Sequence, residues 1–198
     1  MLRFSSDPQN QPARWPLLVR ELLAHSGCTQ QIRLPHGECW QLSCSLTGCA
    51  LQRRGVSYIF SVEQLLQKES GLPPAPSSQL TRQQGKELLQ QLLLSRPEPG
   101  RIYYLPNAKP ECGCLLRREK GGFTWISQPG SRCSFTPQQL TAPDSPQRGV
   151  WEQQRRQAKR LLDRMPERGS VAVLLPEGKK LQSCEYLDIS ADGSVSAP

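Results

Sequence analysis

The chain has 198 residues, of which 36% are hydrophobic and 18 are proline, and its formal net charge is +8. This length allows one domain or two small ones with a real core. The longest apolar run, Val171–Leu175, is far too short to span a bilayer, and the first residues lack the apolar core of a signal peptide. We therefore expect a cytoplasmic protein with no membrane partner, whose eight cysteines are reduced.

The first part of the chain predicts a helix followed by a meander of strands. Residues 1–12 are polar and predict a disordered N-terminus. Apolar residues then recur at helical spacing over 15–25. Four short segments with strand-like alternation follow, at 32–34, 39–46, 49–53 and 56–60. With a short helix capped by Ser61, these elements form a predicted N-terminal lobe at 13–71.

The segment 72–80 is rich in proline and serine and predicts a linker or long loop. A C-terminal lobe is predicted at 81–190, before a frayed tail at 191–198. Its helices begin near Thr81 and at 148, and the first ends before Pro97, because the residue before a proline disfavours helix. The predicted strands are 101–105, a hairpin of 115–118 with 123–127, and a final hairpin of 171–175 with 181–189, with a loop at 128–147.

Leucine–proline pairs recur at about seventy-residue intervals, each after a helix that carries a Leu-Leu pair. The pairs end at Pro35, Pro106 and Pro176, and a cysteine follows each proline by eight or nine positions. The sequence therefore predicts an α+β fold with helices packed on antiparallel β-hairpins, in which the segments form three degenerate helix–hairpin units.

The positive charge favours an anionic partner, and nucleic acid is the commonest one. Basic side chains gather near three predicted hairpins and along the helix that begins at 148. Phosphate contacts require charge and reach rather than a fixed motif. DNA is favoured as the nucleic acid, and the sequence leaves RNA open. The residues predicted to bind it are Arg156, Arg160, Arg164, Lys179, Lys180, Arg117, Arg118, Arg53 and Arg54. Neighbouring acidic residues leave an ordinary solvated surface open as the alternative.

A winged-helix arrangement is a second way to read the same chain. Two helices and a hairpin follow one another between Ser61 and Ser127, and the second helix is rich in hydrogen-bond donors. Its polar residues are Thr81, Arg82, Gln83, Gln84, Lys86 and Gln90. The connection between the two helices is too long and too rich in proline for a tight turn, which favours a plain α+β layer.

Zinc binding and catalysis have weaker support in the sequence. Cys28, His36, Cys39, Cys44 and Cys49 crowd together, but only His36 and Cys39 have the spacing of a zinc knuckle. Strand alternation also places Cys44 on the apolar side, as a small hydrophobic residue. The chain has two histidines and none of the common catalytic motifs. We therefore expect free thiols, no cofactor, no metal and no enzymatic activity.

Taken together, these patterns predict an intracellular, bacterial accessory or regulatory protein that binds nucleic acid through a basic surface. The alternative is a protein-binding modulator, a regulator or inhibitor of another macromolecule. In that case the charge serves solubility or docking to an acidic protein surface.

Overall fold

The structure is a computed structural model that describes residues 11–34, 37–67, 80–95, 97–128 and 130–198. The chain divides into two compact units, unit 1 from Met1 to Pro97 and unit 2 from Glu98 to Pro198. Residues 1–10 of the predicted disordered N-terminus, the predicted linker (apart from its last residue), Pro35 and His36 lie outside the described residues, whereas residues 11 and 12 are helical. The described part is α+β, with five α-helices, a four-stranded antiparallel sheet and a seven-stranded mixed sheet.

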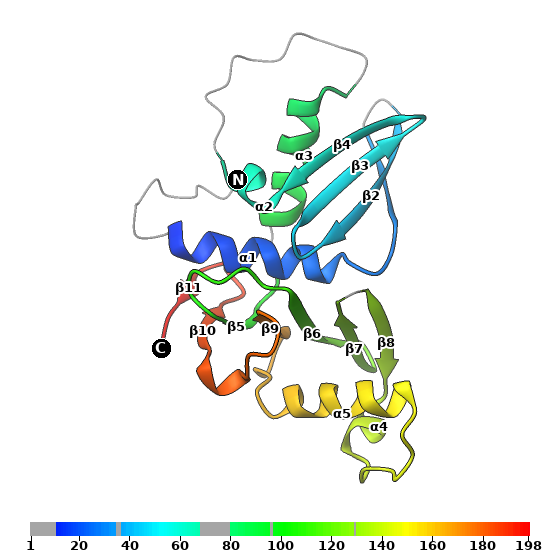
Figure 1. The fold of residues 1–198 in the computed structure, drawn as a ribbon, viewed down its shortest axis with the longest axis vertical. Coiled ribbons are helices and arrows are strands. Elements are labelled where there is room, and N and C mark those ends of the chain that lie inside the picture. Colours follow the sequence, from blue (N-terminus) through cyan, green and yellow to red (C-terminus); the bar gives the residue numbers. More distant parts are fainter. Residues whose placement is uncertain (1–10, 35–36, 68–79, 96, 129) are drawn as a thin grey trace. The chain divides into compact units, whose positions relative to one another are not determined.

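Unit 1 is a helix, a four-stranded meander and two further helices (Figure 1). Its strands lie in the order β1-β2-β3-β4, and each pairs antiparallel with its neighbour in the chain. This confirms the predicted meander. The elements are α1 (Gln11–Ala24), β1 (Gln30–Arg33), β2 (Cys39–Ser45), β3 (Gly48–Arg53), β4 (Val56–Ser61), α2 (Val62–Leu66) and α3 (Arg82–Leu94).

Both helices that follow the meander begin with a complete capping box. The hydroxyls of Ser61 and Thr81 accept a hydrogen bond from the backbone N–H three residues later. In return, the side-chain oxygens of Gln64 and Gln84 accept from the backbone N–H of the capping residue. The predicted start of α3 at Thr81 is therefore confirmed. α3 contacts α1, α2 and β4 and belongs to unit 1, whereas the sequence-based division places it after the linker.

Unit 2 contains a seven-stranded sheet in the order β11-β10-β5-β9-β6-β7-β8. Only β5 and β9 run parallel. Its elements are β5 (Gly100–Tyr104), β6 (Cys112–Glu119), β7 (Gly122–Ser127), β8 (Ser131–Phe135), α4 (Pro137–Thr141), α5 (Val150–Leu162), β9 (Ser170–Leu175), the 3₁₀-helix η2 (Leu181–Ser183), β10 (Glu185–Ile189) and β11 (Val195–Ser196).

The final hairpin predicted from 171–175 and 181–189 is wrong. β9 pairs with β5 and β6, and β10 pairs with the other side of β5. All of β9 from Ser170 to Leu174 is buried, which is typical of a strand covered on both faces rather than of half a hairpin. The apolar strand β9 therefore lies in the centre of the sheet. It separates β5 from β6, although these two strands follow each other in the chain.

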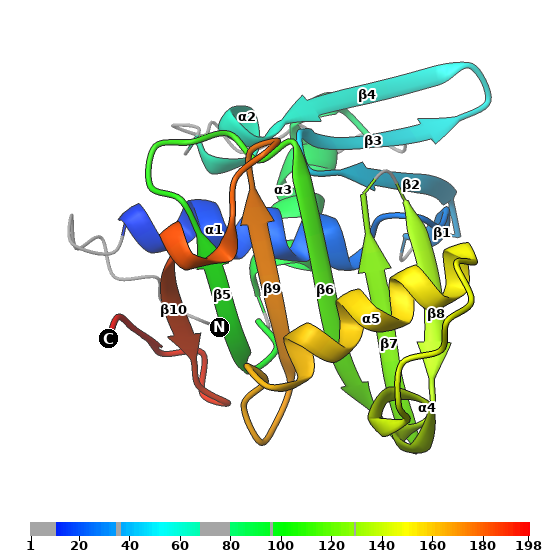
Figure 2. The same cartoon turned by 60° about the horizontal axis from the view of Figure 1, so that its bottom comes forward.

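α5 crosses one face of the seven-stranded sheet (Figure 2). Ala158 and Leu161 on the helix pack into a cluster with sheet residues. The sheet residues of this cluster are Leu116, Phe123, Trp125, Phe135, Val171 and Val173, and Leu140 of α4 joins them. α5 therefore has one buried face, and its outward face is available to solvent.

The two units contain segments with matching registers. In unit 1, Leu42 pairs with Leu51, and Cys49 pairs with Phe60. In unit 2, Leu116 pairs with Trp125, and Phe123 pairs with Phe135. In each case the last strand leads directly into a short helix with a capping box, Ser61/Gln64 for α2 and Thr136/Gln139 for α4. The three leucine–proline segments, in contrast, do not pair alike. The strands on either side of the first, β1 and β2, pair with each other, whereas β5 does not pair with β6 and β9 does not pair with β10.

Candidate nucleic-acid interface

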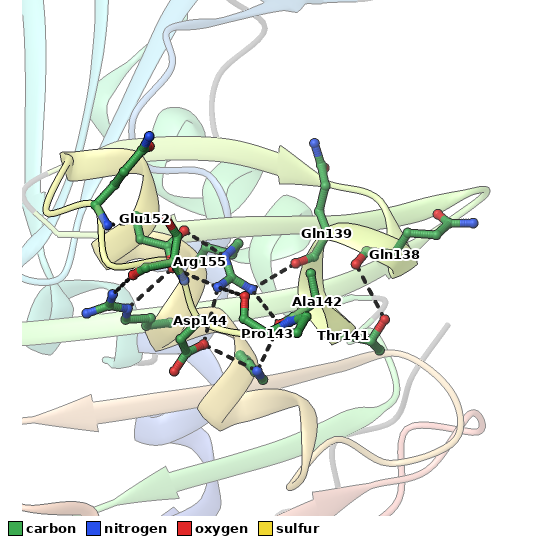
Figure 3. Close-up of polar contacts among 12 residues, drawn as sticks. Gln138, Gln139, Thr141, Ala142, Pro143, Asp144, Glu152 and Arg155 are labelled. Atoms are coloured by element: carbon green, nitrogen blue, oxygen red, sulfur yellow. Dashed lines mark hydrogen bonds and ion pairs between the residues drawn. The ribbon is translucent and has the colours of Figure 1, made fainter.

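One polar side of α5 holds the loop 142–147 through a group of contacts that we call the loop clamp. The clamp consists of this loop with Glu152, Arg155, Arg156 and Lys159. Arg155, which is only 2% exposed, is its centre, and its guanidinium forms a bidentate contact with Glu152 at 2.9 and 2.7 Å (Figure 3). Its remaining N–H groups donate to Asp144 and to the carbonyls of Gln139, Ala142 and Pro143.

The neighbouring charges of α5 complete the loop clamp. Lys159 donates to the Ala142 carbonyl at 3.0 Å and contacts Asp144. Arg156 donates to Glu152 and to the carbonyl of Ser145, whose own N–H donates to Glu152. The Arg155 guanidinium lowers the pKa of Glu152 to about 2. Every charged group in the clamp thus has at least one structural contact, which holds the loop 142–147 against α5.

The outward face of α5 carries a different set of side chains, Gln153, Gln157 and Arg160, which we call the α5 ridge. These positions are three or four residues apart and therefore share one face of the helix. All three are exposed, and none of their side chains forms a hydrogen bond or ion pair with another described residue. The only acidic residue within α5 is Glu152, which is buried in the loop clamp. The ridge is thus rich in donors and free of carboxylates.

Basic residues also gather where α5 ends and the β6–β7 hairpin turns. Arg118 at the end of β6 donates to the sulfur of Met165 at 3.7 Å, and its N–H donates to the Gly169 carbonyl at 3.1 Å. These contacts join the hairpin to the segment that follows α5. We call this group the basic corner; it consists of Arg118, Lys120, Arg160, Arg164 and Arg168.

The basic corner is positive but not free of acids. Glu119, Asp163 and Glu167 are exposed in the same segments, so five basic groups stand against three acidic ones. Arg164 donates to the Arg160 carbonyl at 3.2 Å and thereby caps the C-terminal end of α5. Cations suit this end of a helix because the last carbonyls carry partial negative charge.

The structure brings together only part of the predicted binding set. Arg160, Arg164 and Arg118 lie in the basic corner, and Arg117 beside them is paired with Glu98 at 2.8 Å. Arg156 does not stand in an exposed row with Arg160, because it is bound in the loop clamp.

Lys179 and Lys180 are exposed but lie beyond the far end of β9. α5 leads into the start of this strand, and six residues of strand extend for about 20 Å. The five charges expected on one surface are therefore not gathered there.

Arg53 and Arg54 belong to unit 1 and lie at the β3–β4 turn. Arg53 forms an ion pair with Glu38, and Arg54 adopts a φ of 43°, an unusual value for a residue with a side chain. The turn borders an open hollow of about 670 Å³. Its lining includes a lateral row of aligned residues across the four strands, Gln31, Gln41, Gln52 and Ser57.

Three of the α3 donors that a winged-helix arrangement would expose are used inside unit 1. Lys86 is 5% exposed, Gln90 donates to the carbonyls of Leu65 and Gln67, and Arg82 donates to the Ile59 carbonyl. The sequence analysis did not predict the α5 ridge, because it considered the spacing of the arginines in this helix and not that of the glutamines. The missed signal was the spacing of Gln153, Gln157 and Arg160.

The eight cysteines are free thiols in this structure. Cys44 faces Cys49 across β2 and β3, and a hydrogen bond to Cys49, together with burial, raises the pKa of Cys44. Burial raises the pKa of Cys114 to about 12. Within the described ranges, no three histidine, cysteine or acidic side chains are grouped as a metal site would require. His36, part of the predicted zinc cluster, is outside those ranges.

Across the helices that the structure describes, none is both long and apolar enough to cross a bilayer. No family model, curated protein or solved structure matches this chain.

Proposed function

We propose that the protein binds nucleic acid through unit 2, with the α5 ridge and the basic corner as the contact surface. The observation that carries this proposal is the difference between two sides of α5. The charges on one side of α5 are bound in the loop clamp, whereas the α5 ridge presents amide and guanidinium donors to solvent. Phosphates accept hydrogen bonds from these groups, and each cation that neutralises a phosphate releases counterions.

Fluorescence anisotropy with labelled duplex DNA, single-stranded DNA and duplex RNA tests this proposal over a series of salt concentrations. The test variant is Lys120→Gln with Arg168→Gln, two exposed members of the basic corner whose side chains have no contact within the described structure that their loss would break. Loss of two phosphate contacts should reduce the slope of log affinity against log salt by about 1.8. Folding should hardly change, since exposed charge replacements usually alter stability by about 0.5 kcal/mol or less.

The matched control is Lys179→Gln with Lys180→Gln, which removes the same charge beyond the far end of β9. It should leave the salt slope close to that of the wild type. Equal effects of the two double variants would show that only net charge matters and would contradict a localised surface. Absence of binding by the wild type to all three probes at low salt would remove the proposal.

One observation favours the alternative, a protein partner. Val150 is 72% exposed and Trp151 is 46% exposed at the start of α5, although Trp151 also contacts Phe135 with ring centroids 5.6 Å apart. Exposed tryptophans are often central to protein interfaces. If wild type binds no nucleic acid, a Trp151→Ala variant that loses a protein partner would support this second function.

We also propose two related modules in place of the three helix–hairpin units that the sequence predicted. The matching registers and capping boxes support two related modules, β2–β3–β4–α2 and β6–β7–β8–α4. In this view Leu65 and Leu140, both fully buried, occupy equivalent positions. Truncating either to alanine should destabilise its own unit by about 2 to 5 kcal/mol.

A further inference from the structure

The α5 ridge combines two side-chain types that can distinguish base pairs. A glutamine amide donates and accepts at once, which matches the N6 and N7 groups of adenine, and arginine matches O6 and N7 of guanine. Gln153, Gln157 and Arg160 lie on one exposed face of a 13-residue helix. Glutamine amides can also donate to phosphates, but only a base edge uses the donor and the acceptor of the amide together.

The geometry of α5 suits a groove rather than a flexible strand. A helix of this length extends for about 20 Å, and the major groove of duplex DNA, about 12 Å wide, admits an α-helix. No aromatic residue lies on the α5 ridge, whereas surfaces for single strands usually stack bases on aromatic rings. The major groove of duplex RNA is too narrow for side chains to read.

The surroundings of the helix hold the ridge in a fixed orientation. Ala158 and Leu161 anchor its inner face in the core of unit 2. The loop clamp fixes one flank, because Arg155, Arg156 and Lys159 each bind the loop 142–147. A rigid helix with a free donor face is what readout of base edges requires, since the contacts depend on direction.

Building on the proposed function, we infer that α5 reads the base edges of duplex DNA in the major groove. Gln153, Gln157 and Arg160 are its specificity-determining residues, and the basic corner positions the helix on the phosphates. The protein therefore prefers particular duplex sequences.

The experiment is a selection of bound duplexes from a random-sequence DNA library, followed by anisotropy titrations of the selected site and a scrambled duplex. Wild type should prefer the selected site. Gln157→Ala should reduce that preference by about 5- to 150-fold, the loss expected for one bidentate base contact, with an unchanged salt slope. The control is Gln138→Ala, an exposed glutamine of α4 outside the α5 ridge, which should retain the preference.

The outcomes separate this inference from the proposed function. Salt-dependent binding without any sequence preference, or a preference that survives Gln153→Ala and Gln157→Ala together, overturns groove reading and leaves nucleic-acid binding in place. Tighter binding of single-stranded DNA than of the selected duplex also overturns it. Failure of wild type to bind any probe overturns both.

Discussion

Gly169 is a position at which even one added methyl group should weaken unit 2. Its φ is +86°, and a Cβ placed on it would lie 1.7 Å from the carbonyl oxygen of Pro99. On its other side, the Gly169 carbonyl accepts a bond from the Arg118 N–H. The residue is thus enclosed between the start of β5 and the end of β6, and Gly169→Ala cannot be accommodated without moving backbone.

The size of the effect follows from these contacts. An alanine in the left-handed region costs about 1 to 2 kcal/mol. An ordinary carbon–oxygen separation is about 3.3 Å, so the Pro99 carbonyl must move by about 1.5 Å. That movement breaks its bond to the Ser170 N–H, which is 3.1 Å long, and leaving a buried donor unpaired costs about 1 to 3 kcal/mol. The sum is about 2 to 5 kcal/mol, or a melting temperature lower by about 8 to 20 °C at about 4 °C per kcal/mol for a unit of this size.

Gly178→Ala is the matched control for this prediction. Gly178 also has a positive φ, +74°, but no heavy atom lies within 4 Å of its added Cβ. It should show only the conformational cost, about 1 to 2 kcal/mol. Thermal unfolding followed by tryptophan fluorescence reports on unit 2 through Trp125, which is 1% exposed. Equal destabilisation by the two variants would refute the steric part of the reasoning.

Three further predictions concern stability and the thiols. The pKa of Glu152 is lowered in the folded protein, so its contribution is complete above the unfolded value of 4.5 and is lost as the pH falls toward about 2. Urea unfolding should therefore show Glu152→Gln less stable than wild type at pH 6, with the difference shrinking between pH 4.5 and 2.5; a pH-independent difference would contradict this. The buried hydroxyl of Ser170 has no hydrogen-bond partner within the described structure, so Ser170→Ala should be neutral or stabilising by up to about 1 kcal/mol in the same assay, and a clear loss of stability would show that the hydroxyl is satisfied. Titration of the denatured protein without reductant should find all eight thiols reactive, and a lower number would show a disulfide or a modified cysteine.

The local part of the fold could be predicted from the sequence because local chemistry decides it. Ser61 and Thr81 start helices through their own hydroxyls, and alternation around Trp40 and Leu42 defines β2. The pairing of β9 could not be predicted, because its apolar run is compatible with a hairpin and with a central strand alike. β8 and α4 were also missed, although Thr136 and Gln139 repeat the capping pattern of Ser61 and Gln64.

The candidate site shows the same limit. The spacing of the arginines of α5 predicted a row, but it could not show which of them would be bound by the loop 142–147. Arg156 and Arg160 are four residues apart, yet Arg156 is bound by Glu152 and the loop 142–147. Contacts with residues distant in the sequence therefore bind Arg156. Arg160 remains exposed on the face that also carries Gln153 and Gln157.

The loop clamp gives an exposed segment the exchange behaviour of a helix. The Ser145 N–H is bound to Glu152, and the Ala142 and Pro143 carbonyls are bound to Arg155, so opening this segment requires all of these side-chain contacts with α5 to break. The amide hydrogen of Ser145 should exchange with deuterium at a rate similar to that of the α5 amides, rather than at the rate of a surface loop. A protease that needs an extended substrate should also cleave the loop 142–147 only after α5 has unfolded. The rate of cleavage in this loop should therefore measure the unfolding of the helix.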